Sequence, residues 1–397
     1  MESNKEKQIE WITGLKGVCA VSVVLLHMMA CFYCDTILGA EKIEHLHVYN
    51  FISYTPINII FNGSFSVYIF WMISAFLIAN SWYMYHDMND MKRKIFNKYF
   101  RIIFPVIVCS VMAFLMMHIG LYYHEQAGEI TGLSFFTNER DFNNMTIVNL
   151  AKDLLVGDFF TGKVDIIPPL WTMCIDFYGC ILSVIFLLLF GDKKRGWLAH
   201  VLYIPIQIIK GTTPYVCFLI GNLLARYSTQ KQKNNIVGIS CLIVGIFLGA
   251  YPPSCVPSVG VYSYIYSQFV EKFNTQFDSV QGTAIIYSIA ATLILYGIIR
   301  SDILQELYSN RLFKYLGINS FYIYLIHLPL IYSINAFIFV RLYNTLNRYN
   351  YSVLISCSIA MVSILFIATF FRMFSEKKLV PVSKKIVQSI MRDDLTT

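Results

Sequence analysis

Four ionisable side chains interrupt apolar stretches of this sequence: Lys16, His27, Asp176 and His327. Lys16 and His27 stand at the two ends of the segment LKGVCAVSVVLLH, eleven positions apart. In an α-helix this spacing puts both side chains on one face, about 16 Å apart along the axis. An ionisable group inside a bilayer costs about 2.5 kcal/mol or more, so such groups are candidates for function.

His27 and Lys16 suit two different chemical tasks. A neutral imidazole in an apolar setting is a competent general base for a hydroxyl group. The alternative for His27 is a structural histidine. Lys16, nearer the N-terminus, could meet a phosphate or another anion that arrives from the cytoplasm, or it could be a lysine that snorkels to the membrane interface. The charge of Lys16 alone does not distinguish between these two roles.

Two further candidates lie in later apolar segments. In PPLWTMCIDFYG, Trp171 marks the outer interface and Asp176 follows about 7.5 Å deeper. Asp176 could orient or charge-stabilise a histidine, as a carboxylate does in a catalytic dyad, or it could make a hydrogen bond between helices. His327 in GINSFYIYLIHLPL shares its segment with the hydroxyl of Tyr324. Support of the site and direct chemistry are both open for His327.

The basic stretch MKRKIFNKYFRIIFP precedes another apolar segment. Arg101 stands at the mouth of that segment, just before Pro105, where it could join Lys16 around an anionic donor. For the other basic residues of the stretch, an anchor in a cytoplasmic loop is a sufficient interpretation; these are Lys92, Arg93, Lys94 and Lys98.

The composition indicates that membrane helices position these residues. Of the 397 residues, 56% are hydrophobic and 14% are charged, against about 25% charged in soluble domains. A span needs about 20 mainly apolar residues. We therefore predict an all-α polytopic membrane protein of about ten transmembrane helices, at 12–34, 58–82, 100–119, 169–190, 197–210, 213–227, 235–251, 282–299, 320–340 and 351–372. The segments 197–210 and 213–227 could instead form a re-entrant pair.

The distribution of lysine and arginine predicts the orientation. Most of the 31 basic residues fall in alternate connections that share a side with the N-terminus, so both termini are expected in the cytoplasm. These inner lysines also explain the net charge of +7 without nucleic acid. We expect one membrane domain over 1–397, with outer loops at 120–168 and 252–281. The first helix should be retained, because no signal-peptide cleavage pattern follows it.

A metal site is not predicted. Cys31 and Cys34, in CFYC, have the spacing of a metal or redox pair, but no second pair or His–His motif accompanies them.

Several motifs together resemble one family. GLKGVCAVSVVLLH resembles the signature of the acyltransferase-3 family of integral membrane proteins, in which a basic residue precedes a histidine of the first helix. GSFSVYIFWMISAFLI, YFRIIFP, LWTMCIDFY and SFYIYLIH are similar to further motifs of that family, in the family's order. Lys16 stands where arginine is usual, which replaces a bidentate clamp by a point charge. Ala75 replaces the usual glycine and Asp176 the usual glutamate, and the chain ends at Thr397 without the SGNH esterase-like domain of some members.

The resemblance implies transfer of an acyl group, most often acetyl, from cytoplasmic acyl-CoA to a carbohydrate hydroxyl outside. Lys16 and Arg101 would hold the CoA phosphates, and His27 would act on the acceptor hydroxyl or carry the acyl group. Asp176 would support that histidine or the sugar. Candidate substrate-binding residues are Ser74, Trp171, Tyr324 and His327.

The same resemblance implies the partners and the location. The acceptor would be a surface polysaccharide or its lipid-linked precursor. Acetyl-CoA would be a co-substrate, with no bound cofactor, and the protein would be a multi-pass protein of the plasma membrane.

Two other functions fit a bundle with polar residues at mid-depth. A carrier that exports a glycan or a small molecule is one, although the sequence shows no inverted repeat of the kind that carriers usually have. A structural subunit of a surface-polymer assembly, in which the charges serve helix packing, is the other.

Overall fold

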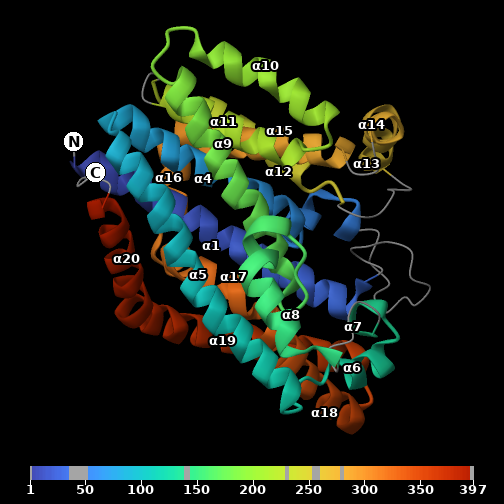
Figure 1. Cartoon of the computed structure of the whole chain (residues 1–397). Helices are drawn as coiled ribbons and strands as arrows, with labels where there is room; N and C mark the ends of the chain where they lie inside the picture. The colour runs from blue at the N-terminus through green and yellow to red at the C-terminus, as the bar shows by residue number, and fades with distance from the viewer. Residues whose placement is uncertain are drawn as a thin grey trace.

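The computed structural model describes residues 2–34, 52–137, 144–228, 232–252, 260–277 and 281–393. Within these ranges the chain forms helices and connecting turns, and no strand (Figure 1). The long helices are α1 (Glu2–Phe32), α4 (Gly63–Tyr85), α5 (Met88–His118), α9 (Trp171–Phe190), α15 (Gln281–Arg300), α17 (Arg311–Leu330) and α19 (Tyr349–Phe374).

Shorter helices connect and flank the long ones. They are η1 (Pro56–Ile60), α6 (His124–Thr131), α7 (Ser134–Thr137), α8 (Ile147–Lys152), η3 (Asp153–Thr161), η4 (Pro168–Leu170), α10 (Gly196–Ile209), η5 (Thr213–Tyr215), α11 (Val216–Ser228), α12 (Asn235–Gly249), α13 (Gly260–Ile265), η6 (Tyr266–Val270), α14 (Glu271–Phe277), α16 (Asp302–Tyr308), η7 (Ile331–Asn335), α18 (Ala336–Leu346), η8 (Ser375–Leu379) and α20 (Val380–Asp393).

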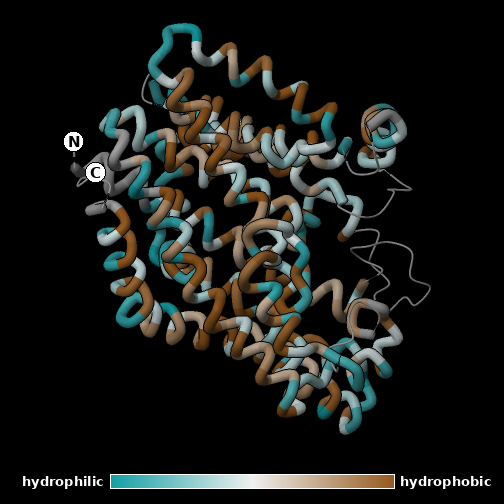
Figure 2. The backbone as a smooth tube through the Cα atoms, viewed as in Figure 1, coloured by the Kyte–Doolittle hydropathy of each residue, from teal (hydrophilic) through white to brown (hydrophobic). Residues whose placement is uncertain are grey.

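The predicted all-α membrane fold is confirmed. Each predicted span overlaps a helical stretch, although the span predicted at 320–340 covers the end of α17, all of η7 and the start of α18. Seven helical stretches in the described part of the chain are long and apolar enough to cross a membrane. Figure 2 shows hydrophobic residues along these helices and hydrophilic ones mainly at their ends and turns. The helices at three other predicted spans, α10, α11 and α12, have only 14, 13 and 15 residues. Ten crossings therefore remain a prediction.

The segment predicted as an outer loop, 120–168, contains more helix than expected. It forms α6, α7, α8 and η3, and η3 packs along α9. Apolar side chains of this segment face outward; Leu155, for example, is 72% exposed. Such exposure is typical of a surface that faces lipid or another apolar partner.

Helix α1 lies at the centre of the bundle, packed between α17 and α4. Close approach to α17 depends on glycines that face each other. A Cβ atom at Gly317 would clash with the carbonyl oxygen of Thr13, and one at Gly17 would lie 2.5 Å from the backbone nitrogen of Gly317. Small residues at membrane helix interfaces let backbones approach in this way. This contact fixes the register between α1 and α17.

We expect Gly317→Ala to destabilise the protein, because the added methyl group must push α1 away from α17. Overpacking of this kind costs about 1–3 kcal/mol. Thermal unfolding in lipid nanodiscs should show a Tm several degrees below that of the wild type. Ser363→Ala, on the exposed side of α19, is the control, and an unchanged Tm for Gly317→Ala would contradict the tight α1–α17 contact.

Side-chain amides fix the end of α4 against its neighbours. Asn62 caps α4 by accepting a hydrogen bond from the Phe65 N–H at 3.0 Å, and its amide group donates to the Gly249 carbonyl at 2.9 Å and to the Tyr287 hydroxyl at 2.8 Å. The start of α4, the end of α12 and the start of α15 are thereby joined at one level of the bundle.

Both ends of the described chain lie at the same end of the bundle, where α1 begins and α20 finishes (Figure 1). Charged pairs gather there: Lys314 Nζ lies 2.9 Å from Glu10 Oε1, and Arg372 Nη1 lies 2.8 Å from Glu376 Oε2. We call this the N-terminal side of the bundle. That this side faces the cytoplasm stays a prediction.

Candidate functional site

A cavity of about 250 Å³ contains His27 and lies in the half of the bundle farther from the N-terminus. Its walls come from α1, α4, α9, α15 and α17, through side chains that are mostly aromatic or small. Trp171, which is 46% exposed, and Tyr324, which is buried, both line it. Trp171 and Tyr324, which the sequence suggests as substrate-binding residues, thus line the same cavity as His27; that they bind substrate stays a prediction. We call this space the histidine cavity.

The hydrogen bonds of His27 determine which ring nitrogen can act as a base. Nδ1 lies 2.8 Å from the carbonyl oxygen of Val23. A carbonyl oxygen only accepts hydrogen bonds, so Nδ1 carries the hydrogen and Nε2 has the free lone pair when the ring is neutral. This tautomer leaves Nε2 available to take a proton from a bound hydroxyl group.

His327 supports His27 from α17. The Nδ1 of His327 donates to the Tyr324 carbonyl at 2.6 Å, which leaves Nε2 as the acceptor 3.3 Å from His27 Nδ1. If His27 gains a proton at Nε2, its Nδ1–H becomes a stronger donor to both Val23 and His327. Sequence reasoning left the role of His327 open, and the structure places it beside His27, fully buried.

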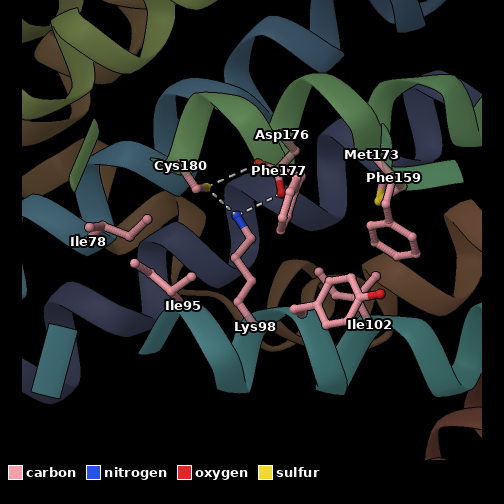
Figure 3. A pocket seen from close by; sticks show the side chains of 10 residues that line it. Ile78, Ile95, Lys98, Ile102, Phe159, Met173, Asp176, Phe177 and Cys180 are labelled. Carbon is pink, nitrogen blue, oxygen red and sulfur yellow. Dashed lines mark hydrogen bonds and ion pairs between the residues drawn. The ribbon is translucent and has the colours of Figure 1, made fainter. Parts of the chain in front are cut away.

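A second, smaller cavity of about 40 Å³ lies between α5 and α9 (Figure 3). Lys98 crosses it from α5, and its Nζ lies 2.7 Å from Asp176 Oδ2. The same Nζ donates to Ser74 Oγ at 3.1 Å and to Cys180 Sγ at 2.8 Å. The other walls are apolar, among them Ile102 and Phe177. We call this space the lysine crevice.

The structure places Asp176 and Ser74 at this crevice and not at His27. Asp176 points toward α5, where Lys98 compensates its charge (Figure 3), and the place beside His27 where a carboxylate was expected is taken by His327. Ser74 accepts from Lys98. A buried carboxylate needs a cation, and Lys98 is the one within reach.

Lys98 is the residue that sequence reasoning misplaced. It was interpreted as a cytoplasmic anchor, but its side chain is only 28% exposed and holds Asp176. One signal was available. Lys98 and Arg101 are three residues apart and so share a helix face, and Lys98 lies between the apolar residues Ile95 and Ile102.

Lys16 reaches the neighbourhood of Lys98 and Asp176 from α1. It interacts electrostatically with Lys98, Asp176 and Arg101. Arg101, which is exposed, lies at the edge of this group. We call Lys16, Lys98 and Arg101, together with Asp176, the cationic cluster. Three cations and one carboxylate leave a positive excess that suits a polyanionic ligand.

The two sites lie at different depths on the same helices. On α1, Lys16 and His27 are about 16 Å apart along the axis. On α4, Trp71 lines the histidine cavity and Ile78 lines the crevice; on α9, the cavity lining ends at Thr172 and the crevice lining runs from Met173 to Cys180. In each case the crevice residue is nearer the N-terminal side. One bundle thus carries a cationic site and a histidine site at different levels along its helices.

A buried carboxylate in η3 is not part of either site. Asp158 is fully buried, and neither of its carboxylate oxygens has a hydrogen-bond partner in the described ranges. Burial, with a smaller contribution from the charge of Asp153, raises the pKa of Asp158 to about 8. Asp153, in contrast, has hydrogen-bond partners: its Oδ2 accepts hydrogen bonds from the backbone N–H groups of Asp165 and Ile166 at 2.8 and 2.7 Å.

We expect Asp158→Asn to gain stability relative to the wild type as the pH rises. An unfolded carboxyl group ionises near pH 4, whereas Asp158 in the folded protein keeps its proton up to a pKa of about 8. The folded state therefore binds more protons between these values, and wild-type stability falls with pH in this window. Asparagine does not titrate. The Tm difference between Asp158→Asn and wild type should increase by several degrees from pH 5 to pH 8.

The control for this experiment is Glu129→Gln, at an exposed position of α6. Its Tm difference from wild type should stay constant over the same pH range. If the Tm difference between Asp158→Asn and wild type also stayed constant from pH 5 to pH 8, the Asp158 carboxyl group would not be buried in its acid form.

Comparison with known proteins identifies the family. No curated protein and no solved structure gives a match to this chain. A family model described as an acyltransferase domain, that of the acyltransferase-3 family, matches residues 9–373. The match includes α1 with Lys16 and His27, the cationic residues of α5, and α17 with His327. The chain therefore belongs to the acyltransferase-3 family of membrane acyltransferases.

Proposed function

We propose that the protein is an O-acetyltransferase that moves an acetyl group from cytoplasmic acetyl-CoA to a hydroxyl of a surface polysaccharide or of its lipid-linked precursor. The observation that carries the proposal is the separation of the cationic cluster and the lysine crevice from the histidine cavity along α1, α4 and α9. It lets a polyanionic donor and a hydroxyl acceptor approach from opposite sides of the plasma membrane.

Each site has a defined task in the reaction. Lys16 and Arg101 bind the phosphates of acetyl-CoA through charge-assisted hydrogen bonds. Asp176, Ser74 and Cys180 occupy the three N–H groups of Lys98, so Lys98 joins the other two cations by exchanging its weak contact with Cys180 Sγ for a phosphate oxygen. The thioester extends toward His27. Nε2 of His27 takes the proton of the acceptor hydroxyl, whose oxygen attacks the thioester carbonyl carbon. The C–S bond breaks, the new ester forms, and the CoA thiolate receives the proton from His27.

The neutral His27–His327 pair supports this role. The proton taken up at Nε2 makes His27 an imidazolium, and the Val23 carbonyl and His327 Nε2 both accept from its Nδ1–H. These acceptors are in place before the reaction, so stabilising the new charge needs little rearrangement.

The test uses sealed membrane vesicles that contain the wild type or His27→Ala, matched for expression, with radiolabelled acetyl-CoA supplied on the cytoplasmic face. Label should enter extracted glycan or lipid-linked saccharide only with the wild type. Labelled succinyl-CoA in a parallel sample distinguishes acetyl from other acyl groups. Equal label with both proteins, or no label with either donor, would favour a carrier or an assembly subunit instead.

A further inference from the structure

The histidine cavity contains no fixed charge. Apart from His27, its lining residues within the described ranges are apolar, aromatic or hydroxyl-bearing, and none is Asp, Glu, Lys or Arg. The nearest charged residue of the other site on a shared helix is Asp176, about 6 Å along α9 from Thr172 of the cavity wall, and its charge is compensated by Lys98 on the side of the crevice. A charged group brought into this cavity would lose part of its hydration and find no counter-charge among the described lining residues, which is unfavourable.

Aromatic rings from three helices form one wall of the cavity. The ring of Tyr68 packs edge to face with Trp71 and with Tyr287, at centroid distances of 5.1 and 5.4 Å, and Trp71 packs in the same way with Trp171 at 6.1 Å. The interplanar angles of 61°, 73° and 73° show that neighbouring rings of this wall are steeply inclined to one another. The face of an aromatic ring is partially negative and attracts polarised C–H groups, such as the axial C–H groups of a sugar.

The tyrosine rings are held in place by their own hydroxyl groups. Tyr287 donates to the Tyr251 carbonyl at 2.8 Å, and Tyr324 donates to the Pro169 carbonyl. They therefore present ring faces more than hydroxyl groups to the cavity. The hydroxyls of Ser64 and Thr283 also line it and have no protein partner among the described residues, so they can bind the hydroxyls of a ligand.

The volume limits what can enter. About 250 Å³ is below the roughly 300–1,000 Å³ of cavities that enclose drug-sized ligands. It accommodates one sugar ring next to His27, while the rest of a longer glycan stays outside, beyond the half-exposed Trp171.

From these observations we infer that the sugar residue acylated by this protein is an uncharged pyranose, such as a hexose, a deoxyhexose or an N-acetylhexosamine, stacked on the aromatic wall of Tyr68, Trp71 and Trp171. A uronic acid, a phosphorylated sugar or a free amino sugar does not fit as the reacting residue. A carboxylate on the ring would in addition pair with the imidazolium of His27 and hold it in the form that is not a base. This inference rests on the proposed acyl transfer.

The experiment locates the acetyl group on the glycan that the protein modifies. Membranes containing the wild type receive ¹³C-labelled acetyl-CoA, and tandem mass spectrometry of oligosaccharides released under mild conditions identifies the labelled residue. We expect all ¹³C-labelled acetyl groups to lie on uncharged sugar residues of the glycan. Label on a residue with a carboxylate, a phosphate or a free amine would overturn the inference and leave the proposed function intact. Absence of label from the glycan would instead refute the proposed function, and this inference with it.

Variants of Trp171 test the aromatic wall separately. Trp171→Leu should lower the labelling rate at limiting acceptor by about five- to tenfold, because leucine has no aromatic face. Trp171→Phe should recover most of the rate. The control is Trp197→Leu, at a partly exposed position of α10 outside both cavities, which should match the wild type. Equal rates for the leucine and phenylalanine variants of Trp171 would contradict stacking.

Discussion

Replacing His27 by glutamine should lower the turnover number for acetyl transfer by about 10²- to 10⁴-fold, the range contributed by a general base. Glutamine can keep a polar group near the position of Nε2 but cannot accept the proton of the acceptor hydroxyl. The KM for acetyl-CoA should change little, because the cationic cluster lies about 16 Å away along α1. Initial rates of label transfer at varied acetyl-CoA concentrations measure both constants.

A matched control exists on α5. His118 Nδ1 bonds the Phe114 carbonyl one turn earlier at 2.9 Å, the same local contact that His27 makes with Val23, but His118 is exposed and lines neither cavity. His118→Gln should retain wild-type activity. If His27→Gln also retained it, or raised only the KM for the donor, His27 would not be the base.

The second large effect concerns the Lys98–Asp176 pair. Lys98→Met leaves the Asp176 carboxylate without its cation in a site where it is only 15% exposed. Removing one partner of a fully buried pair costs about 3–5 kcal/mol, and we expect somewhat less here because Lys98 is 28% exposed. The Tm in lipid nanodiscs should fall strongly. The double variant Lys98→Met/Asp176→Leu should recover most of the loss, because no unpaired charge remains.

Activity separates a structural role of Lys98 from a role in donor binding. The stable double variant should still show a KM for acetyl-CoA at least about tenfold above the wild type, since a phosphate contact worth roughly 1.5 kcal/mol or more is missing. Lys233→Met, which breaks the exposed pair with Asp302, is the control and should change neither Tm nor KM appreciably. A double variant with a wild-type KM would assign the pair to stability alone.

Much of the fold could be predicted from the sequence because the membrane restricts what apolar segments can form. With no water to bond to the backbone, runs of about 20 apolar residues become helices, and each predicted segment overlaps a helical stretch. The prediction was weakest where hydropathy is ambiguous. The helices at 197–210 and 213–227 are short. The segment 147–161, within the predicted outer loop, is helical, and η3 packs along α9 while several of its apolar side chains face outward.

The candidate site divides in the same way. Lys16 and His27 could be placed on one face at two depths, because both lie on one helix whose geometry fixes their separation. Their partners lie on other helices. His327 is 300 positions from His27, and Asp176 is 78 positions from Lys98. Such contacts depend on how each helix is rotated and on the register between helices, which hydropathy does not encode.

The sequence by itself thus determined the class of protein, the helices, and the face of α1 that carries Lys16 and His27. Only the tertiary structure decided that Asp176 neutralises Lys98 and that a second histidine supports the first. The reason is physical: the glycines at 17 and 317 allow α1 and α17 to approach closely, and this contact brings His327 to His27. Asp176 projects from α9 toward α5, where the nearest cation compensates its charge.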